Sequence, residues 1–327
     1  MASLADDSAL LGELDGLAAT GRYQQVLERL GRLAAAVVET RTRLALLAAE
    51  AHGRLGDHVA GAHWAETALA LARTRGERHA ELRARNYQGA IALRRGQMSE
   101  AEQHFTGALE LARALSDHAT QARCLNNLGI IANIRGDPAA ALANYRLALV
   151  AYQQAGLARG IAETHHNIGI SLRDQGNLRG ALEAAEQAVR LATEAGDEQL
   201  AALAATGRAA LHLQSGDPAL AAAELARAAA QYERIGFRAG LAEVWRVQAG
   251  VARSRGDLTV ALQLLGDASL LAAQHGSSDT LADIERDLAA TLDGAGDPAA
   301  ARAGRARAIA LYRQLGAKRA ADELAAL

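Results

Sequence analysis

The chain has 327 residues, half of them hydrophobic but only 3% aromatic, a composition rich in Ala and Leu that favours helices packed on helices. Its 35 basic and 37 acidic residues almost cancel, which argues against nucleic acid or an anionic membrane as a partner. Cys124 is the only cysteine, so an intrachain disulfide is excluded, and the N-terminal residues carry two Asp where a secretory signal carries Arg or Lys. We therefore expect a cytoplasmic protein.

The first expected element is a helical hairpin over residues 5–35 that turns at Gly21. The next turn glycine, Gly56, follows after thirty-five residues, whereas all later spacings are forty. We therefore predict that residues 1–38 form a degenerate N-terminal capping repeat.

Residues 39–316 are predicted to form seven forty-residue repeats. One series of glycines recurs every forty residues: Gly56, Gly96, Gly136, Gly176, Gly216, Gly256 and Gly296. A second series lies twenty residues on: Gly76, Ser116, Gly156, Gly196, Gly236, Gly276 and Gly316. Such a regular period indicates a solenoid in which each repeat is two helices and two turns. Residues 317–327 are predicted to be a C-terminal capping helix with Lys318, Arg319, Asp322 and Glu323 in solvent.

The residues around these glycines predict how each helix begins. An Asp or Asn follows most glycines of the first series and can cap the next helix, while the glycine takes a left-handed conformation. Pro138, Pro218 and Pro298 then occupy the first helical turn, where a proline breaks no hydrogen bond.

Two columns of small residues lie on the second helix of each repeat. They are Gly61, Ala101, Ala141, Ala181, Ala221, Ala261 and Ala301, followed seven residues later by Ala68, Ala108, Ala148, Ala188, Ala228, Ala268 and Ala308. Seven residues are about two helical turns, so both columns share one face, where small side chains permit close packing on the first helix.

These residues resemble the tetratricopeptide repeat family, whose pattern combines a glycine in the first helix with small residues and an aromatic in the second. The repeat that fits best contains Leu125, Leu128, Gly129, Gly136, Ala141, Tyr145 and Ala148. The family's late proline is absent, and Ala replaces the first-helix Gly at 49, 209, 249 and 289. A forty-residue period is similar to the long-repeat branch of kinesin light chains, polarity adaptors and bacterial regulator sensor domains. The resemblance implies an all-α, right-handed α-solenoid superhelix of about eight helical hairpins, forming one solenoid over residues 1–327.

In the family, the first helices line a concave groove that binds peptides or proteins. Mapped onto this sequence, the N-terminal half of the groove contains Arg43, Arg54, Arg83, Arg94, Arg123 and a single Glu50. The C-terminal half mixes Arg173, Arg246, Arg253 and Arg286 with Glu163, Asp174, Glu243, Asp283 and Asp293. An acidic or C-terminal carboxylate segment should therefore prefer the N-terminal half. The alternative is that these Arg are solvated or paired with neighbouring Glu.

A cluster of Asn beside exposed Ile completes the predicted binding site, because an Asn amide can hold a peptide backbone through both a donor and an acceptor. The candidate partner-binding residues are Arg83, Asn86, Arg94, Arg123, Asn126, Asn127, Ile130, Asn133, His166, Asn167, Ile170 and Arg173. Of the adjacent His165 and His166, only the second is expected to reach the groove.

No catalytic motif is present in the sequence, and the spacing of His52, His58 and His63 does not suit a metal site. Cys124 is expected to be a buried, inert thiol. We predict a non-catalytic adaptor or scaffold without a cofactor. Two alternatives stay open: the peptide- or ligand-sensing domain of a bacterial signalling or transcription regulator, and a structural subunit of a larger assembly.

Overall fold

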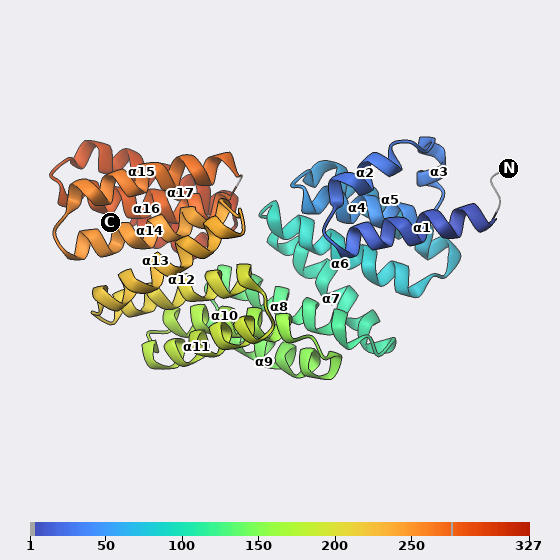
Figure 1. Ribbon diagram of the computed structural model, residues 1–327, viewed down its shortest axis with the longest axis horizontal. Coiled ribbons are helices and arrows are strands. Elements are labelled where there is room, and N and C mark those ends of the chain that lie inside the picture. Colours follow the sequence, from blue (N-terminus) through green and yellow to red (C-terminus); the bar gives the residue numbers. More distant parts are fainter. Residues whose placement is uncertain (1–3, 276) are drawn as a thin grey trace. The chain divides into compact units, whose positions relative to one another are not determined.

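The computed structural model describes residues 4–275 and 277–327, and these residues form eighteen α-helices joined by short turns (Figure 1). No strand occurs in these two ranges, which confirms the predicted all-α solenoid class. Gly276 and residues 1–3 of the predicted capping repeat lie outside the described residues. The chain divides into two compact units, Met1–Asn127 (unit 1) and Leu128–Leu327 (unit 2). We describe each by itself, and a single solenoid over residues 1–327 stays a prediction.

Unit 1 begins with one helix of sixteen residues and two short helices, and continues with longer hairpins. Its helices are α1 (Leu4–Ala19), α2 (Tyr23–Leu30), α3 (Ala35–Glu39), α4 (Thr42–Arg54), α5 (His58–Arg75), α6 (Arg78–Arg94) and α7 (Met98–Ala114). The predicted turn at Gly21 is present, with φ of +72°. The short helix α3 is an addition to the predicted hairpin. Helix α8 (His118–Ile134) contains the boundary between the units.

Unit 2 consists of helices of nearly equal length and ends with a short one. They are α9 (Pro138–Ala155), α10 (Ala158–Asp174), α11 (Leu178–Glu194), α12 (Glu198–Gln214), α13 (Pro218–Arg234), α14 (Ala239–Ser254), α15 (Leu258–Gln274), α16 (Ser278–Gly294), α17 (Pro298–Gln314) and α18 (Lys318–Ala325). The charged residues of α18 named above are exposed, as predicted for a terminal helix.

The predicted turn chemistry is confirmed. All seven glycines of the first series have φ between +73° and +85°, a conformation that side chains disfavour. In the second series Ser116 takes the same conformation with φ of +55°. The carboxylates of Asp57, Asp137, Asp217, Asp257 and Asp297 and the amide oxygen of Asn177 accept a hydrogen bond from the backbone N–H three residues on. These local interactions end one helix and start the next.

The predicted small-residue columns lie in the interior of the fold. Every member of both columns is buried. A Cβ placed on Gly89 of α6 would lie 2.8 Å from the ring of Phe105 in α7, and one on Gly129 of α8 would lie 2.6 Å from Cδ1 of Tyr145 in α9. The glycine therefore makes room for the aromatic ring that fills the hairpin.

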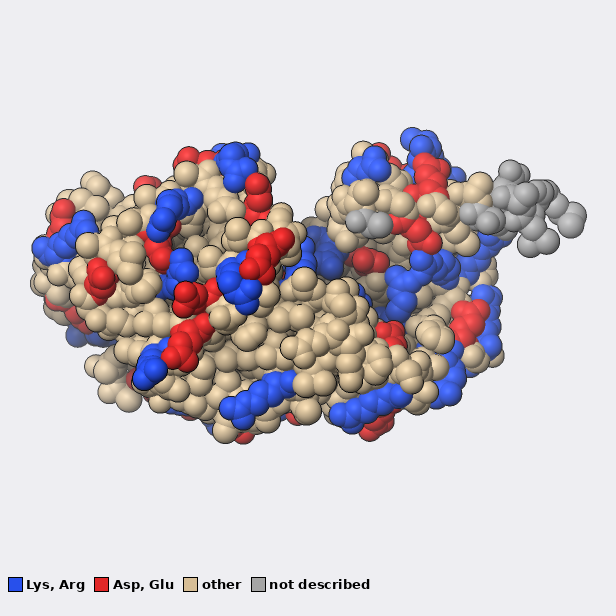
Figure 2. All heavy atoms as spheres, turned by 60° about the horizontal axis from the view of Figure 1, so that its bottom comes forward, with Lys and Arg blue, Asp and Glu red and all other residues tan. Residues whose placement is uncertain are grey.

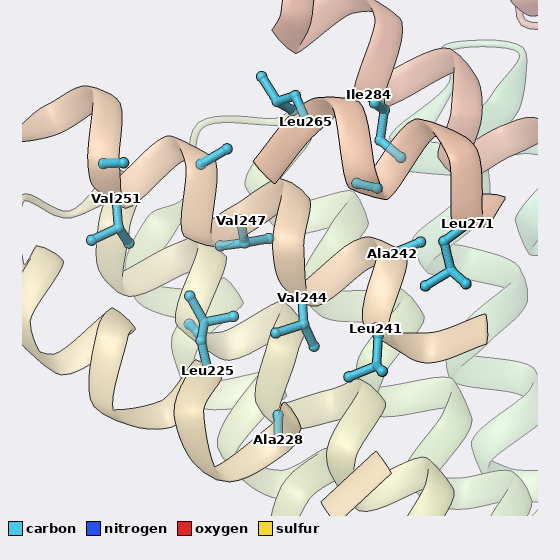
Figure 3. Close-up of a cluster of buried hydrophobic side chains, with 14 of the residues drawn as sticks. Leu225, Ala228, Leu241, Ala242, Val244, Val247, Val251, Leu265, Leu271 and Ile284 are labelled. Atoms are coloured by element: carbon cyan, nitrogen blue, oxygen red, sulfur yellow. The ribbon is translucent and has the colours of Figure 1, made fainter. Parts of the chain in front are cut away.

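Aliphatic side chains join successive hairpins into a continuous core. In unit 2, Leu225 of α13, Val244 and Val247 of α14, Leu265 of α15 and Ile284 of α16 are at most 3% exposed and point into one cluster (Figure 3). Because each hairpin buries its apolar face against the next, the repeats stabilise one another.

The first helices of neighbouring hairpins also contact each other directly. In unit 1 α4 packs on α6, and in unit 2 α10 packs on α12, α12 on α14 and α14 on α16. The side chains that leave this row of first helices form what we call the inner face of each unit.

Candidate partner-binding surfaces

The predicted binding residues are divided between the two units. Unit 1 holds Arg83, Asn86, Arg94, Arg123, Asn126 and Asn127, and unit 2 holds Ile130, Asn133, His166, Asn167, Ile170 and Arg173. Each unit therefore presents its own part of the predicted groove.

The inner face of unit 1 is organised around a hydrogen-bonded pair. The Tyr87 hydroxyl of α6 donates to Glu50 Oε2 of α4 at 2.6 Å. Arg83 Nη2 donates to the Tyr87 hydroxyl at 3.2 Å and lies 3.5 Å from Glu50 Oε2. Burial, together with the charge of Glu50, raises the pKa of Tyr87 well above its usual value, so this hydroxyl stays protonated. Tyr87 thus positions both Arg83 and Glu50.

Further guanidinium groups surround this pair. Arg54 and Arg123 are near enough to act electrostatically on the Tyr87 hydroxyl, and we call Arg54, Arg83 and Arg123 the arginine cluster. Arg94 lies further along α6. Burial is the main cause that lowers the pKa of His58, and the charge of Arg94 is the second. Within the described ranges, Arg54, Arg94 and Arg123 make no ion pair or side-chain hydrogen bond, and all three are exposed. One carboxylate among four guanidinium groups leaves this face with a surplus of positive charge.

The asparagines of unit 1 are less available than the sequence suggests. Asn126 is only 7% exposed, because it lies on the side of α8 that faces its neighbours, so its predicted exposure in a groove is not observed. Asn86 is partly buried, and the Cys124 thiol lies 3.8 Å from its Oδ1. Asn127 is partly buried.

In unit 2 the predicted residues of α8 and α10 form one hydrogen-bonded group. Asn133 accepts from the Ser171 hydroxyl at 2.8 Å and donates to Asp174 Oδ2 at 3.4 Å. Arg173 donates to Asp174 Oδ1 through Nε at 3.0 Å and Nη2 at 2.9 Å. Asn133 is therefore held in a defined orientation, and the residue is partly exposed.

His166 packs along α12. A Cβ on Gly207 would lie 2.9 Å from His166 Cε1, so the glycine admits the imidazole ring. Burial, helped by the charge of Arg173, lowers the pKa of His166 to about 4, which keeps the ring neutral at physiological pH. The remaining predicted residues of unit 2 are partly buried: Ile130 on α8, and Asn167 and Ile170 on α10.

A second polar network in unit 2 goes beyond the predicted site. Arg246 of α14 donates to Glu243 at 2.6 Å and to Asp287 at 2.6 Å, and Arg286 of α16 donates to Asp287 at 2.9 Å. Glu243, Arg246 and Arg286 are recognisable from the sequence as inner-face positions. Asp287 lies one residue outside the expected positions, so only its contacts identify it.

Tyr312 and Asp283 extend this network. The Tyr312 hydroxyl of α17 donates to Asp283 Oδ1 at 2.5 Å and accepts from Arg286 at 3.1 Å. Burial opposes ionisation of Asp283, but Arg286, Arg246 and the hydrogen bond from Tyr312 hold its pKa below the usual value. The network is thus fully charged, and its ions are mutually paired.

Neither Cys124 nor a group of metal-ligating side chains forms a further site in the described part of the chain. Cys124 is 0% exposed, and burial raises the pKa of its thiol to about 12, which confirms the expected buried, unreactive cysteine. Across residues 4–275 and 277–327 there is no group of three His, Cys, Asp or Glu placed to hold a metal, and no helix with the length and hydropathy to cross a membrane. On the face shown in Figure 2, acidic and basic side chains are intermixed.

Comparison with known proteins agrees with the repeat geometry. The family model described as tetratricopeptide repeat matches residues 81–154, which cover α6 to α9. Residues 81–154 are tetratricopeptide repeats. Tetratricopeptide-type hairpins with the same turn and packing residues occur on either side of this segment in the structure. No curated protein matches the chain.

Solved structures with this repeat fold match over most of the chain. A Rap protein complexed with competence and sporulation factor has a TM-score of 0.72 at 12% identity, with 96% of this chain and 99% of that chain covered. NprR in complex with its cognate peptide NprX has a TM-score of 0.63 at 15% identity, covering 92% and 88%. Aspartyl phosphate phosphatase F from Bacillus subtilis has a TM-score of 0.58 at 12% identity, covering 97% and 96%. At such identities the likeness concerns the fold.

Proposed function

We propose that this chain is a non-catalytic adaptor or scaffold that holds a protein or peptide partner on its inner faces. The arginine cluster of unit 1 is the part that recognises an acidic side chain or a C-terminal carboxylate of that partner. The observation that carries the proposal is the surplus of guanidinium groups around Glu50 and Tyr87, with Arg54 and Arg123 unpaired among the described residues.

Guanidinium groups suit this task because they bind a carboxylate through two parallel hydrogen bonds. Arg83 is already oriented by Tyr87, so less side-chain entropy is lost when it binds. A surface on which positive charge exceeds negative charge also speeds the encounter with an acidic partner at low salt.

The fold similarities support a peptide as the partner. One of the similar structures was solved with its cognate peptide NprX, and another was solved with competence and sporulation factor. In unit 2 of this chain, the partly exposed Asn133 offers hydrogen bonds to an extended backbone, and the partly exposed Ile130 and Ile170 offer apolar contacts. We place Asn167, His166 and Arg173 at the margin of these contacts in unit 2, and Asn86 and Asn127 in the part of the site that belongs to unit 1.

The test is peptide binding by variants with reversed charge in the cluster. A peptide library is presented with free and with amidated C-termini, and with acidic or neutral sequences, and the best binder is measured by calorimetry. Arg83→Glu combined with Arg123→Glu should weaken binding at least tenfold, because each removes a charge-assisted hydrogen bond and adds repulsion.

Arg113→Glu is the matched control, since Arg113 is an exposed arginine on α7, outside the inner face of unit 1. Equal affinity of the double variant and this control would refute the role of the cluster. Raising the salt concentration should weaken binding of the wild type more than binding of the double variant.

The peptide-sensing domain of a bacterial regulator is the second candidate function, and the similarity to Rap and NprR favours it. A sensor changes conformation when its ligand binds, whereas a scaffold does not need to. Small-angle scattering with and without the selected peptide separates the two, because only the sensor should change its radius of gyration. If no peptide binds and the chain assembles through other surfaces, it is a structural subunit.

A further inference from the structure

The C-terminal helix of unit 2 touches a turn at the other end of the same unit. Arg319 in the first turn of α18 donates from Nη1 to the carbonyl oxygen of Gly136 at 3.3 Å. Gly136 lies in the turn between α8 and α9 and is separated from Arg319 by 183 residues. The side-chain hydrogen bonds of unit 2 described above join residues at most 41 positions apart, so this contact is of a different kind.

The turn leaves space for the arginine. A Cβ on Gly136 would lie 3.1 Å from Cβ of Arg319 and still nearer to its Cδ. Gly176 occupies the equivalent turn one repeat later with nearly the same φ, +77° against +80°, and a Cβ there would meet no atom within 4 Å. The close approach is thus specific to the turn at Gly136.

Charges on the inner face connect this contact to the candidate binding residues. Arg319 is held by Glu323, whose Oε1 lies 2.7 Å from its Nε, and after Glu323 it is Asp174 whose charge raises the pKa of the guanidinium. Asp174 also accepts hydrogen bonds from Asn133 and Arg173. Arg173 in turn acts electrostatically on Asp283 of α16. Asp174 and Arg173 of α10 therefore interact electrostatically with α18 and α16.

We propose that Arg319 is a latch that holds α18 against the α8–α9 turn and so closes unit 2 on itself beside Asn133 and Asp174. The contact consists of one charged hydrogen bond from a side chain that is half exposed, so it opens readily without unfolding the hairpins. This inference is independent of the arginine cluster, which lies in unit 1.

Amide hydrogen exchange on the full chain, followed by mass spectrometry, tests the latch without any ligand. Arg319→Ala should speed exchange about three- to tenfold in two places, residues 318–325 and residues 135–140, because one hydrogen bond joins both segments. Lys318→Ala is the control for the loss of an exposed charge on α18. Glu323→Ala controls for the pair within the helix, and it should affect α18 alone.

A second pair of variants separates loss of the Arg319 contact from the backbone strain that any side chain causes at a left-handed turn position. Gly136→Ala and Gly176→Ala introduce the same left-handed alanine, and only the first displaces Arg319. Faster exchange of α18 in Gly136→Ala than in Gly176→Ala supports the latch. The proposal is overturned if exchange at residues 135–140 is the same in Arg319→Ala and Lys318→Ala, or if the two glycine variants give equal exchange in α18. Neither result would bear on peptide binding by unit 1.

Discussion

Burial decides which polar residues of the inner faces are free to bind. Arg54, Arg94 and Arg123 project from first helices into solvent without a pairing carboxylate in the described structure, whereas Asn126 on the same type of helix is enclosed. Arg83 is intermediate, because Tyr87 and Glu50 orient it while a third of its side chain stays exposed. Binding at this face therefore depends on a few long side chains rather than on the whole column of predicted positions.

His166 makes the stability of unit 2 depend on pH. Its pKa is lowered from 6.5 to about 4 in the folded state, so the unfolded state binds more protons between these values. Stability contributed by the neutral ring is fully present above about pH 6.5 and is lost as the pH falls towards 4, by at most about 3 kcal/mol. Urea unfolding from pH 7.5 to 4 should show a shallower decline for His166→Gln than for the wild type. Parallel curves would contradict the assignment, and the exposed His275 supplies the control variant, His275→Gln.

At the level of the helical hairpin, glycine has two different roles. Turn glycines adopt a left-handed backbone, whereas Gly89 and Gly129 are helical and leave room for an aromatic ring of the partner helix. The second role depends on the ring. Where Ala185 stands in place of the aromatic, a Cβ on Gly169 would meet the Ala181 carbonyl oxygen at 3.3 Å, a smaller clash.

The space around a helical glycine decides whether alanine is tolerated there, so we predict opposite effects of two glycine-to-alanine changes in helices of unit 2. Gly129→Ala should lower the free energy of unfolding by about 1–3 kcal/mol, because the Cβ overlaps the Tyr145 ring in a tightly packed core. Gly266→Ala should raise it by about 0.5–1 kcal/mol, because no atom lies within 4 Å and alanine is the better helix former. Thermal and urea denaturation measure both. A stabilised Gly129→Ala would show that the ring moves aside.

At the level of the whole molecule, each of the two compact units contains hydrophobic clusters of its own. The core of unit 1 includes Leu14, Val26 and Leu44, and the core of unit 2 includes Leu225, Val244 and Leu265. Stability in repeat proteins is the sum of repeats and their interfaces, so long arrays unfold in parts when one part is weaker. Unit 1 contains the short helices α2 and α3, of eight and five residues.

We therefore expect unit 1 to unfold at a lower urea concentration than unit 2. The two tryptophans report on the units separately, since Trp64 lies in α5 and Trp245 in α14. Trp245→Phe leaves a fluorescence signal from unit 1, and Trp64→Phe leaves one from unit 2. Coincident midpoints in the two variants would show that the chain unfolds as one cooperative structure.

Most of the fold was predictable because its determinants are local. Each turn depends on residues at most five positions apart, such as the caps at Asp57 and Asp137 and the first-turn prolines. These turns recur with the forty-residue period, and the structure confirms them. The small-residue columns also follow from helical geometry alone. For the candidate site, the sequence indicated the first helices and their excess of arginine in the N-terminal half.

Only the tertiary structure decided which of those residues are free and which are engaged. The contact of Tyr87 with Glu50 joins residues 37 positions apart, and the contact of Arg319 with Gly136 joins residues 183 positions apart. Such pairs depend on how successive hairpins are rotated relative to one another. This rotation is the sum of small packing angles between helices, and no local sequence pattern encodes those angles. The sequence by itself determined the repeat and its helices, and the packing between repeats determined the burial of Asn126 and the exposure of Arg123.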